Sequence, residues 1–401
     1  MIFCVILLIL LLLSYIYDIQ KQTKNKTFCY NMMLFVFILV AGLRWRIGID
    51  TPVYLYQYYH EIPTLDNFSW SNYSITDSPL YLLIASFVKT IGGRFFIVQI
   101  IQASIVNVLI FRYIKKHSRY LFTCLFFYTI VCYTSYNMEI MRGSLSIVIC
   151  LYANDYILNK KWVKGYLLYL LSVLFHAQSI VMFILPLLYF LRFNEAGLVA
   201  CVIAFMIGSI VMNLFGEYFF VFETNDALAT KYEKYSNSEK YGVQAGNINF
   251  YLVQIFPMLF YSIFSTMLVK WYSPNNKLLK LEPLILIGVL FILIRMNLEI
   301  AYRYVDIFKI YFVLFFSESF IMLAKGLRSY SKNLALLRSY IIFIPFFLVV
   351  FVYNYLLSEN YSLRYTPYST IIDREVSQER ELMYQTLNSF RFYPLPNDNE
   401  Y

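Results

Sequence analysis

The sequence is poor in charged residues, which make up 14% of its 401 positions, whereas apolar residues make up 60%. Soluble proteins contain roughly 25% charged and 45–50% apolar residues. The apolar residues form long blocks, such as 1–17 and the uncharged run 340–357. A helix of roughly 20 apolar residues crosses a bilayer, and only helices or closed barrels satisfy their backbone groups there. Because the alternating ten-residue segments of a barrel are absent, the sequence predicts an all-α, polytopic membrane protein.

Residues and motifs that hold cofactors are also scarce. The chain has three histidines, none of them paired at i+4, and six cysteines without CxxC spacing. This composition favours neither a zinc site nor a disulfide framework, and no glycine-rich phosphate loop is present. We therefore expect no metal and no cofactor. The first block lacks the basic start and the small-residue cleavage site of a signal peptide, so we expect it to be a retained span.

The basic loops predict the topology. Lys/Arg clusters mark cytoplasmic loops. All of the clusters fall on the cytoplasmic side only if 79–91 is re-entrant and 163–190 breaks at His176 into two short spans. This arrangement gives about 12 crossings, with the N-terminus and the loops 44–94 and 216–247 outside, and a polar tail over 358–401. The apolar runs lie near 1–17, 28–43, 79–91, 95–112, 120–136, 140–158, 163–190, 197–215, 248–270, 281–297, 300–323 and 339–357.

The two faces then differ in the kind of basic residue that they carry. The inner loops carry mostly lysine, whereas Lys89 is the only lysine of the short outer segments. The outer arginines are Arg44, Arg46, Arg94, Arg142, Arg295 and Arg303. The guanidinium group binds phosphate and carboxylate with two parallel hydrogen bonds. The distribution therefore indicates an anionic ligand on the outer face.

The densest group of polar residues is L-R-W-R-I-G-I-D-T-P-V-Y, which starts the first outer loop. Arg44 and Arg46 could hold a diphosphate while Asp50 takes part in proton transfer. The alternative is an interfacial anchor in which Asp50 caps the helix after Pro52.

Three further groups are candidates, each with a structural alternative. Arg142 stands just inside an apolar block, where a charge costs ~2.5–3.5 kcal/mol, or it simply pairs with Glu139. His176, at the proposed break, is a candidate base or a buried histidine bonded to a carbonyl. Arg303, with Arg295, could close an anion site, or it pairs with Asp306.

Taken in order, these motifs resemble the EpsG family of exopolysaccharide and O-antigen polymerases (Wzy-type). The matching stretches are R-x-R-x-G-x-D-T-x-x-Y followed by S-P-L-Y, then N-M-E-I-M-R-G, L-F-H-A-Q-S-I and Y-R-Y-V-D-I-F-K-I-Y-F, over roughly residues 28–325. Two positions depart from the family pattern. Gly143 stands where a glutamine is usual, and the serine of F-H-x-S-A comes one place later, at Ser179.

The resemblance implies a GT-C-like membrane glycosyltransferase in the bacterial inner membrane. Its substrate would be an undecaprenyl-diphosphate-linked oligosaccharide, polymerised on the outer face. The implied partners are membrane lipid, a chain-length regulator and a flippase of the same pathway, and no nucleic acid. Carried onto this chain, the site comprises Asp50 and His176 as catalytic residues and Arg44, Arg46, Tyr54, Arg142 and Arg303 as substrate-binding residues.

Other functions remain open from the sequence. An O-antigen ligase would share the donor, but its usual sign is a larger late outer loop. A flippase should carry ionisable residues near the midplane of several spans and inverted repeats, whereas the charges here gather at one face. An acyltransferase acting on sugars has only the outer histidine in its favour.

Overall fold

The structure is a computed structural model that describes residues 2–197, 199–206, 250–296, 301–325, 332–357 and 359–387. Throughout these residues the regular elements are helices, and the one β-bridge joins Arg44 to Thr370. The all-α prediction is therefore confirmed. The expected outer loop 216–247 lies outside the described residues, as do Asn297 and Glu299 of the late arginine segment.

The chain divides into two compact units, residues 1–183 with 351–401 and residues 184–350. The first unit contains α1 (Ile2–Leu13) continued by η1 (Ser14–Ile19), α2 (Lys26–Gly42), α3 (Thr51–Tyr56) continued by η2 (Gln57–Glu61), the turns η3 (Leu65–Asn67), η4 (Trp70–Asn72) and η5 (Ile75–Asp77), α4 (Pro79–Thr90), α5 (Phe95–His117), α6 (Leu121–Tyr128), η6 (Thr129–Tyr133), η7 (Ser135–Glu139), α7 (Met141–Leu158), α8 (Trp162–Phe175), η8 (Ala177–Phe183), α15 (Glu359–Tyr365) and α16 (Gln378–Leu387).

The second unit contains η9 (Leu185–Leu188), a helix over Glu195–Met206, η11 (Phe250–Ile255), α11 (Phe256–Tyr272), η12 (Lys277–Leu281), α12 (Glu282–Arg295), α13 (Tyr302–Ala324) and α14 (Lys332–Phe347). The π-helical η14 (Leu348–Leu357) runs across the division between the units.

The helices fall on the predicted apolar runs. Among the described residues, four are long and apolar enough to cross a membrane: Ile2–Ile19, Phe95–His117, Tyr251–Tyr272 and Tyr302–Ala324. Six further apolar helices have 10–17 residues. The chain is thus a helical membrane protein, while the number of about 12 crossings stays a prediction from the basic loops.

The long run 163–190 breaks where we expected, but its second half differs from the prediction. α8 ends at Phe175, and the extended backbone of His176 (φ −161°) ends the helix. We expected a second short membrane helix beyond the break. Residues 177–188 instead form the 3-10 turns η8 and η9, with Pro186 in the first turn of η9. Proline lacks the N–H that a continuing α-helix would use at this position.

Buried amides fix the segment that precedes α7 in the first unit. Asn107 of α5 donates to Asn137 at 2.7 Å, and Asn137 donates to the Tyr133 carbonyl at 3.0 Å. Gln102, one turn away on α5, donates to the Tyr136 carbonyl at 3.1 Å and to Ser144 at 2.8 Å. A dry interior offers no water to such groups, so the bonds from Asn107 and Gln102 to residues 136 and 137 hold the irregular segment 135–139 against α5.

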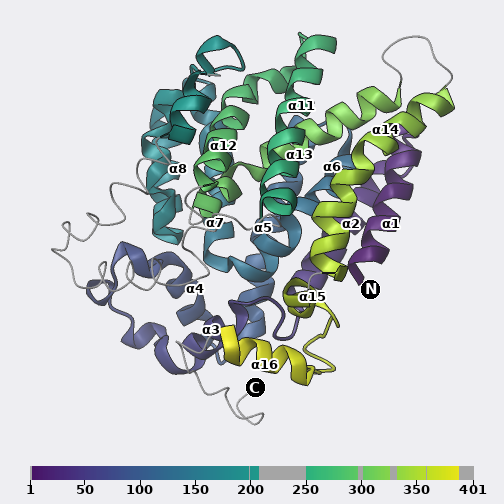
Figure 1. The fold of residues 1–401 in the computed structure, drawn as a ribbon. Coiled ribbons are helices and arrows are strands. Elements are labelled where there is room, and N and C mark those ends of the chain that lie inside the picture. The colour runs from purple at the N-terminus through teal and green to yellow at the C-terminus, as the bar shows by residue number, and fades with distance from the viewer. Residues whose placement is uncertain are drawn as a thin grey trace. The chain divides into compact units, whose positions relative to one another are not determined.

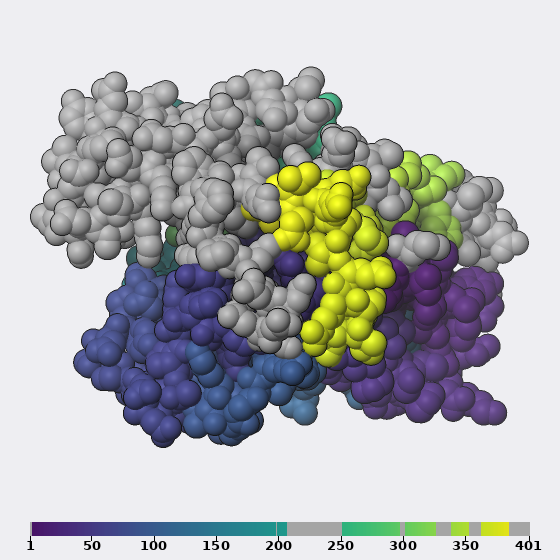
Figure 2. All heavy atoms as spheres, turned by 90° about the horizontal axis from the view of Figure 1, so that it is seen from below, coloured from purple at the N-terminus to yellow at the C-terminus, as the bar shows by residue number. Residues whose placement is uncertain are grey.

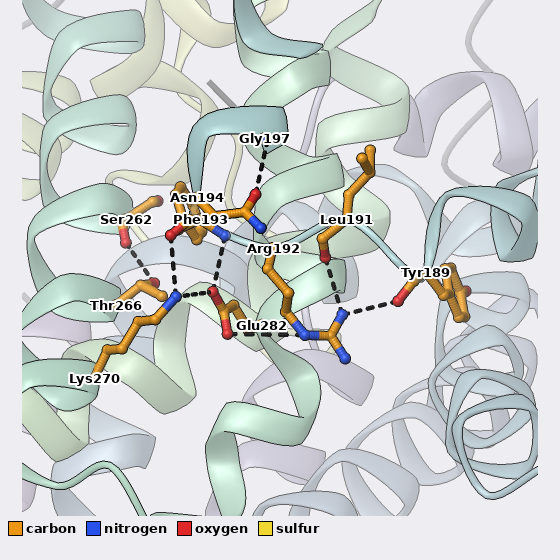
Figure 3. A network of polar contacts seen from close by, with 10 residues as sticks. All are labelled: Tyr189, Leu191, Arg192, Phe193, Asn194, Gly197, Ser262, Thr266, Lys270 and Glu282. Carbon is orange, nitrogen blue, oxygen red and sulfur yellow. Dashed lines mark hydrogen bonds and ion pairs between the residues drawn. The ribbon is translucent and has the colours of Figure 1, made fainter. Parts of the chain in front are cut away.

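The second unit is built around α13, whose most apolar 18-residue window is 89% buried. Gly288 lets α12 pack close to it, since a Cβ there would lie 2.6 Å from the Phe312 ring. At the start of α12 the buried Glu282 accepts from Lys270 at 2.9 Å and from the Phe193 backbone at 2.8 Å (Figure 3). These bonds tie α11 and α12 to the chain at 193, so Lys270 has a structural partner.

The C-terminal segment 359–387 packs against the first loop of the same unit. The Tyr384 hydroxyl donates to the Arg46 carbonyl at 2.7 Å, and the Ile371 N–H donates to the Leu43 carbonyl at 2.9 Å. Figure 1 shows α16 beside α3, and Figure 2 shows this segment, in yellow, on the surface over the N-terminal part of the chain. The described tail therefore shares the side of the loop 44–94, which we predict to be the outer side.

Gly48 is the tightest point of the loop. Its φ is +94°, and a Cβ would lie 2.0 Å from the Met138 carbonyl oxygen. Gly92 also has positive φ (+71°), but a Cβ there meets no atom within 4 Å. Left-handed backbone alone costs an L-residue about 1–2 kcal/mol. We expect Gly48→Ala to lower the melting temperature in detergent at least twice as much as the control Gly92→Ala; equal shifts would contradict this close packing.

Candidate functional site

Four outer-loop and tail arginines line one cavity of about 70 Å³ in the first unit. Its lining residues are Arg44, Trp45, Arg46, Thr51, Leu55, Tyr59, Arg94, Phe95, Phe96, Gln99, Ile371 and Arg374. Among the described residues, no carboxylate lines this cavity, which we call the arginine cavity. A volume of this size holds roughly five waters or a small anion.

Arg44 is the buried member of the set. It has no exposed surface, and its Nη1 donates to the Ala41 carbonyl. Among the described residues, its Nε and Nη2 have no hydrogen-bond partner. Burial lowers the pKa of Arg44 to about 10, which leaves the guanidinium charged near pH 7. A buried charge with open donors is costly until an anion reaches it.

Arg46 is only partly satisfied. It is 9% exposed, has a left-handed backbone (φ 46°), and donates from Nη2 to Glu381 at 2.9 Å. Its buried Nε has no hydrogen-bond partner among the described residues. The guanidinium therefore keeps an unused donor while Glu381 balances part of its charge.

The amino end of α5 forms another wall of the arginine cavity. Arg94 is the residue before the helix, and Phe95, Phe96 and Gln99 follow it in the lining. The first N–H groups of a helix have no intrahelical partner and carry partial positive charge. This end of α5 therefore adds to the attraction that the arginines exert on an anion.

Lys89, the one lysine of the loop 44–94, does not line this cavity. Its ammonium donates to three carbonyls at the end of η2, those of Tyr58 (3.0 Å), Tyr59 (3.1 Å) and Ile62 (2.7 Å). All three donors of the ammonium are thus used within the loop. Lys89 has a structural role.

Arg142, Tyr54 and Asp50 form a second group. The Arg142 guanidinium lies 5.2 Å from the Tyr54 ring centroid and hydrogen-bonds to the Tyr54 side chain. Asp50 is close enough to interact electrostatically with both residues. Asp50 stands at the N-cap of α3, yet its side chain makes no capping hydrogen bond. The capping alternative for Asp50 is therefore wrong.

Tyr81 links this group to the arginine cavity. Its ring lies 5.7 Å from that of Tyr54, and it interacts electrostatically with both Arg44 and Arg142. Tyr81 is the tyrosine of the S-P-L-Y motif. The two motifs that come first in the sequence thus meet at this side chain.

Glu139 does not pair with Arg142, so that structural alternative is also wrong. Its carboxylate accepts from Arg364 at 3.4 Å and from the Tyr365 hydroxyl. Both partners belong to α15. Arg142 is accordingly left to Tyr54 and Asp50, and Glu139 anchors the C-terminal segment.

His176 lies beside the start of α7. A Cβ at Gly143 would stand 3.5 Å from the imidazole Cδ2 and 3.5 Å from the amide Nε2 of Gln178. The turn after His176 is fixed by a hydrogen bond between Ser146 and Ser179. The structure therefore brings His176 next to the residue that follows Arg142.

In the second unit Arg295 and Arg303 share one aromatic partner. Each guanidinium lies 5.9 Å from the Tyr302 ring centroid, and Arg295 also donates to Gln254 at 2.6 Å. Asp306 pairs with Lys309 at 2.5 Å. The two arginines are thus neighbours within their unit, as the sequence suggested.

Sequence reasoning missed part of the arginine cavity. It set Arg94 aside for lack of a partner motif, and it placed Arg374 in a polar tail without a role. Neither residue has a local signal, because their contribution depends on segments that meet only in the folded unit. Tyr81, in contrast, carried a signal in the S-P-L-Y motif.

The helices and the cavity define a helical membrane protein with an arginine-lined site at one end of its first unit. The family model of the EpsG family matches residues 27–370, so the chain belongs to the EpsG family. This confirms the resemblance, and with it a place in polysaccharide biosynthesis. Comparisons with curated proteins and with solved structures found no match.

The contact between positions 143 and 178 generates a prediction. Glutamine, usual in the family at 143, would enter the space that Gln178 and His176 occupy. We expect Gly143→Gln to lower the melting temperature and the second change Gln178→Ser to restore most of it, a coupling of about 0.5–3 kcal/mol. The control Gly143→Ala should be tolerated, since its Cβ makes only ordinary contacts of 3.4–3.5 Å. Additive effects of the two substitutions would show that the side chains do not compete.

Proposed function

We propose that the chain is a polysaccharide polymerase of the Wzy type. It joins undecaprenyl-diphosphate-linked oligosaccharide units on the outer face of the bacterial inner membrane, for O-antigen, capsule or exopolysaccharide. The observation that carries the proposal is the arginine cavity, whose lining includes the buried Arg44 with two guanidinium nitrogens that have no hydrogen-bond partner among the described residues. A diphosphate supplies the charge and the acceptor oxygens that such donors require.

In the proposed reaction a hydroxyl at the non-reducing end of one lipid-linked unit attacks the anomeric carbon of the growing chain. The new glycosidic C–O bond forms as the bond from that carbon to the diphosphate breaks. Undecaprenyl diphosphate leaves with the electron pair, and the proton of the hydroxyl passes to a base. Arginines that hold the leaving diphosphate stabilise the charge that develops on it.

Asp50 and His176 are the candidate bases in this proposal. Asp50 interacts electrostatically with Arg142, and a positioned carboxylate can accept a proton. His176 lies by Gly143, the residue that follows Arg142 in the sequence. Arg142 is assigned to the diphosphate together with Arg44 and Arg46, and Tyr54 to orienting Arg142 or stacking on a sugar.

Arg303 keeps its assignment as a substrate-binding residue and belongs to the second unit. Tyr302 lies against both Arg303 and Arg295 and would limit the orientations of the two guanidinium groups. In this proposal Arg295 has only the role of a neighbouring charge.

A deletion strain tests the function with one gel of surface glycan. Loss of a polymerase leaves a single repeat unit on the lipid core. Loss of a ligase or of a flippase leaves none, and loss of an acyltransferase keeps the full ladder. An unchanged length distribution of O-antigen, capsule and secreted polysaccharide alike, or a lipid core without any repeat unit, would refute the proposal.

Complementation of that strain tests the site. We expect Arg44→Ala, Arg142→Ala and Asp50→Ala to reduce polymer by about 10²–10³-fold, the effect of removing one group that stabilises a transition state. The matched control is Arg119→Ala, an exposed arginine of a predicted cytoplasmic loop. Membrane levels of each variant are measured by immunoblot. Wild-type chain length in both Arg142→Ala and Asp50→Ala, at normal levels, would overturn the assignment.

A further inference from the structure

The arginine cavity is completed by a stretch of chain that follows the family match. The match ends at residue 370, whereas Ile371 and Arg374 line the cavity and Glu381 pairs with Arg46. We propose that residues 371–387 form part of the diphosphate site, with Arg374 as a binding residue. Glu381 is in this proposal an internal counter-ion of Arg46 that the diphosphate displaces. The inference rests on the proposed function. It adds two residues to the diphosphate site: Arg374, which favours binding, and Glu381, which competes with the ligand.

Arg374 is held in place at the cavity. Its guanidinium carbon lies 5.3 Å from the Trp45 ring centroid, and its Nε donates to the Ile371 carbonyl at 3.3 Å. The backbone is left-handed there (φ 50°) and follows a turn in which Asp373 accepts from the Thr370 N–H at 2.6 Å. A strained backbone persists where surrounding contacts impose it, often at ligand sites. Arg374 is an exposed residue and lines the cavity.

The segment is anchored without the side chains of Arg374 and Glu381. Backbone bonds join Trp45 N–H to the Ser369 carbonyl and Ile371 N–H to the Leu43 carbonyl, each at 2.9 Å. Tyr384 adds its bond to the Arg46 carbonyl. Substituting Arg374 or Glu381 therefore removes charge from the cavity region while the segment keeps its place.

Glu381 is the carboxylate that Arg46 contacts. The pair is 2.9 Å apart, and the side chains are 10% and 28% exposed for Arg46 and Glu381. A pair at that exposure is weak compared with a dianion that reaches several guanidinium groups. A diphosphate can therefore take the Arg46 donor from Glu381, and Glu381 competes with it.

Pyrophosphate is the probe for this site. The full chain is purified in detergent, and Trp70, Trp162 and Trp271 are changed to Phe, which leaves Trp45 as the one remaining tryptophan of four. Pyrophosphate should change Trp45 emission and bind at least tenfold more tightly than inorganic phosphate. Chloride at equal ionic strength should leave the emission unchanged. Because Arg374 lies on Trp45, affinities are also measured by titration calorimetry. Absence of a pyrophosphate response, or equal affinity for phosphate, overturns the inference.

The two substitutions should act in opposite directions. Arg374→Ala is expected to weaken pyrophosphate binding about tenfold to hundredfold, the loss of one charged hydrogen-bonding partner. Glu381→Gln is expected to strengthen binding severalfold, because Arg46 loses its competitor. The control Arg119→Ala should bind as the parent does. If both tail variants weaken binding, the segment has only a structural role, and if Arg374→Ala binds normally, Arg374 is not a ligand residue.

These outcomes are separate from those of the proposed function. The glycan gel reports whether the chain polymerises repeat units, whatever binds in the arginine cavity. If the deletion strain loses its long glycan chains but Arg374→Ala binds pyrophosphate normally, the inference about Arg374 is rejected and the proposed function stands. Normal laddering in the deletion strain rejects the proposed function, whereas the signs of the two binding effects still report on the segment.

Discussion

The first loop depends on one close approach, that of the Gly48 backbone to the carbonyl of Met138. No side chain fits between them, and Thr51 reinforces the contact by donating to the Ile47 carbonyl at 2.6 Å and to Met138 at 3.3 Å. Met138 is itself held by the amide bonds of its segment to α5. The loop is consequently fixed with Arg44 and Arg46 on one side of the turn and Asp50 on the other. Both candidate groups of polar residues derive their positions from this contact.

Lys89 and Arg44 differ in how many of their hydrogen-bond donors have a partner within the fold. The ammonium of Lys89 is a point charge with three donors, and three loop carbonyls take all of them. The guanidinium of Arg44 has five donors in a fixed plane, and the Ala41 carbonyl reaches only one nitrogen. An anion would satisfy the remaining donors. The different roles of the two residues thus follow from guanidinium geometry and not from charge alone.

Much of the fold was predictable because it is local. Apolar runs became helices at nearly the expected bounds, and the run 163–190 broke at His176. The structural alternatives for Asp50 and Glu139 were wrong for a different reason. Both assumed that a charged group interacts with its neighbour in sequence, as capping and i, i+3 pairing rules suggest. Here Asp50 lies near Arg142 and Glu139 bonds to Arg364, contacts that span about 90 and 225 positions of sequence and so have no local signature.

The sequence by itself determined the membrane class, the helices and the gathering of arginines in the outer segments, since each follows from composition and order along the chain. The EpsG motifs added the family. Only the tertiary structure decided which arginines act together. Arg44, Arg94 and Arg374 line one cavity because α2, α5 and the C-terminal segment meet there, whereas Arg295 and Arg303 share Tyr302 in the other unit. An anion site needs donors within a few ångströms of one point, and proximity of that kind is a property of packing, which no stretch of sequence encodes alone.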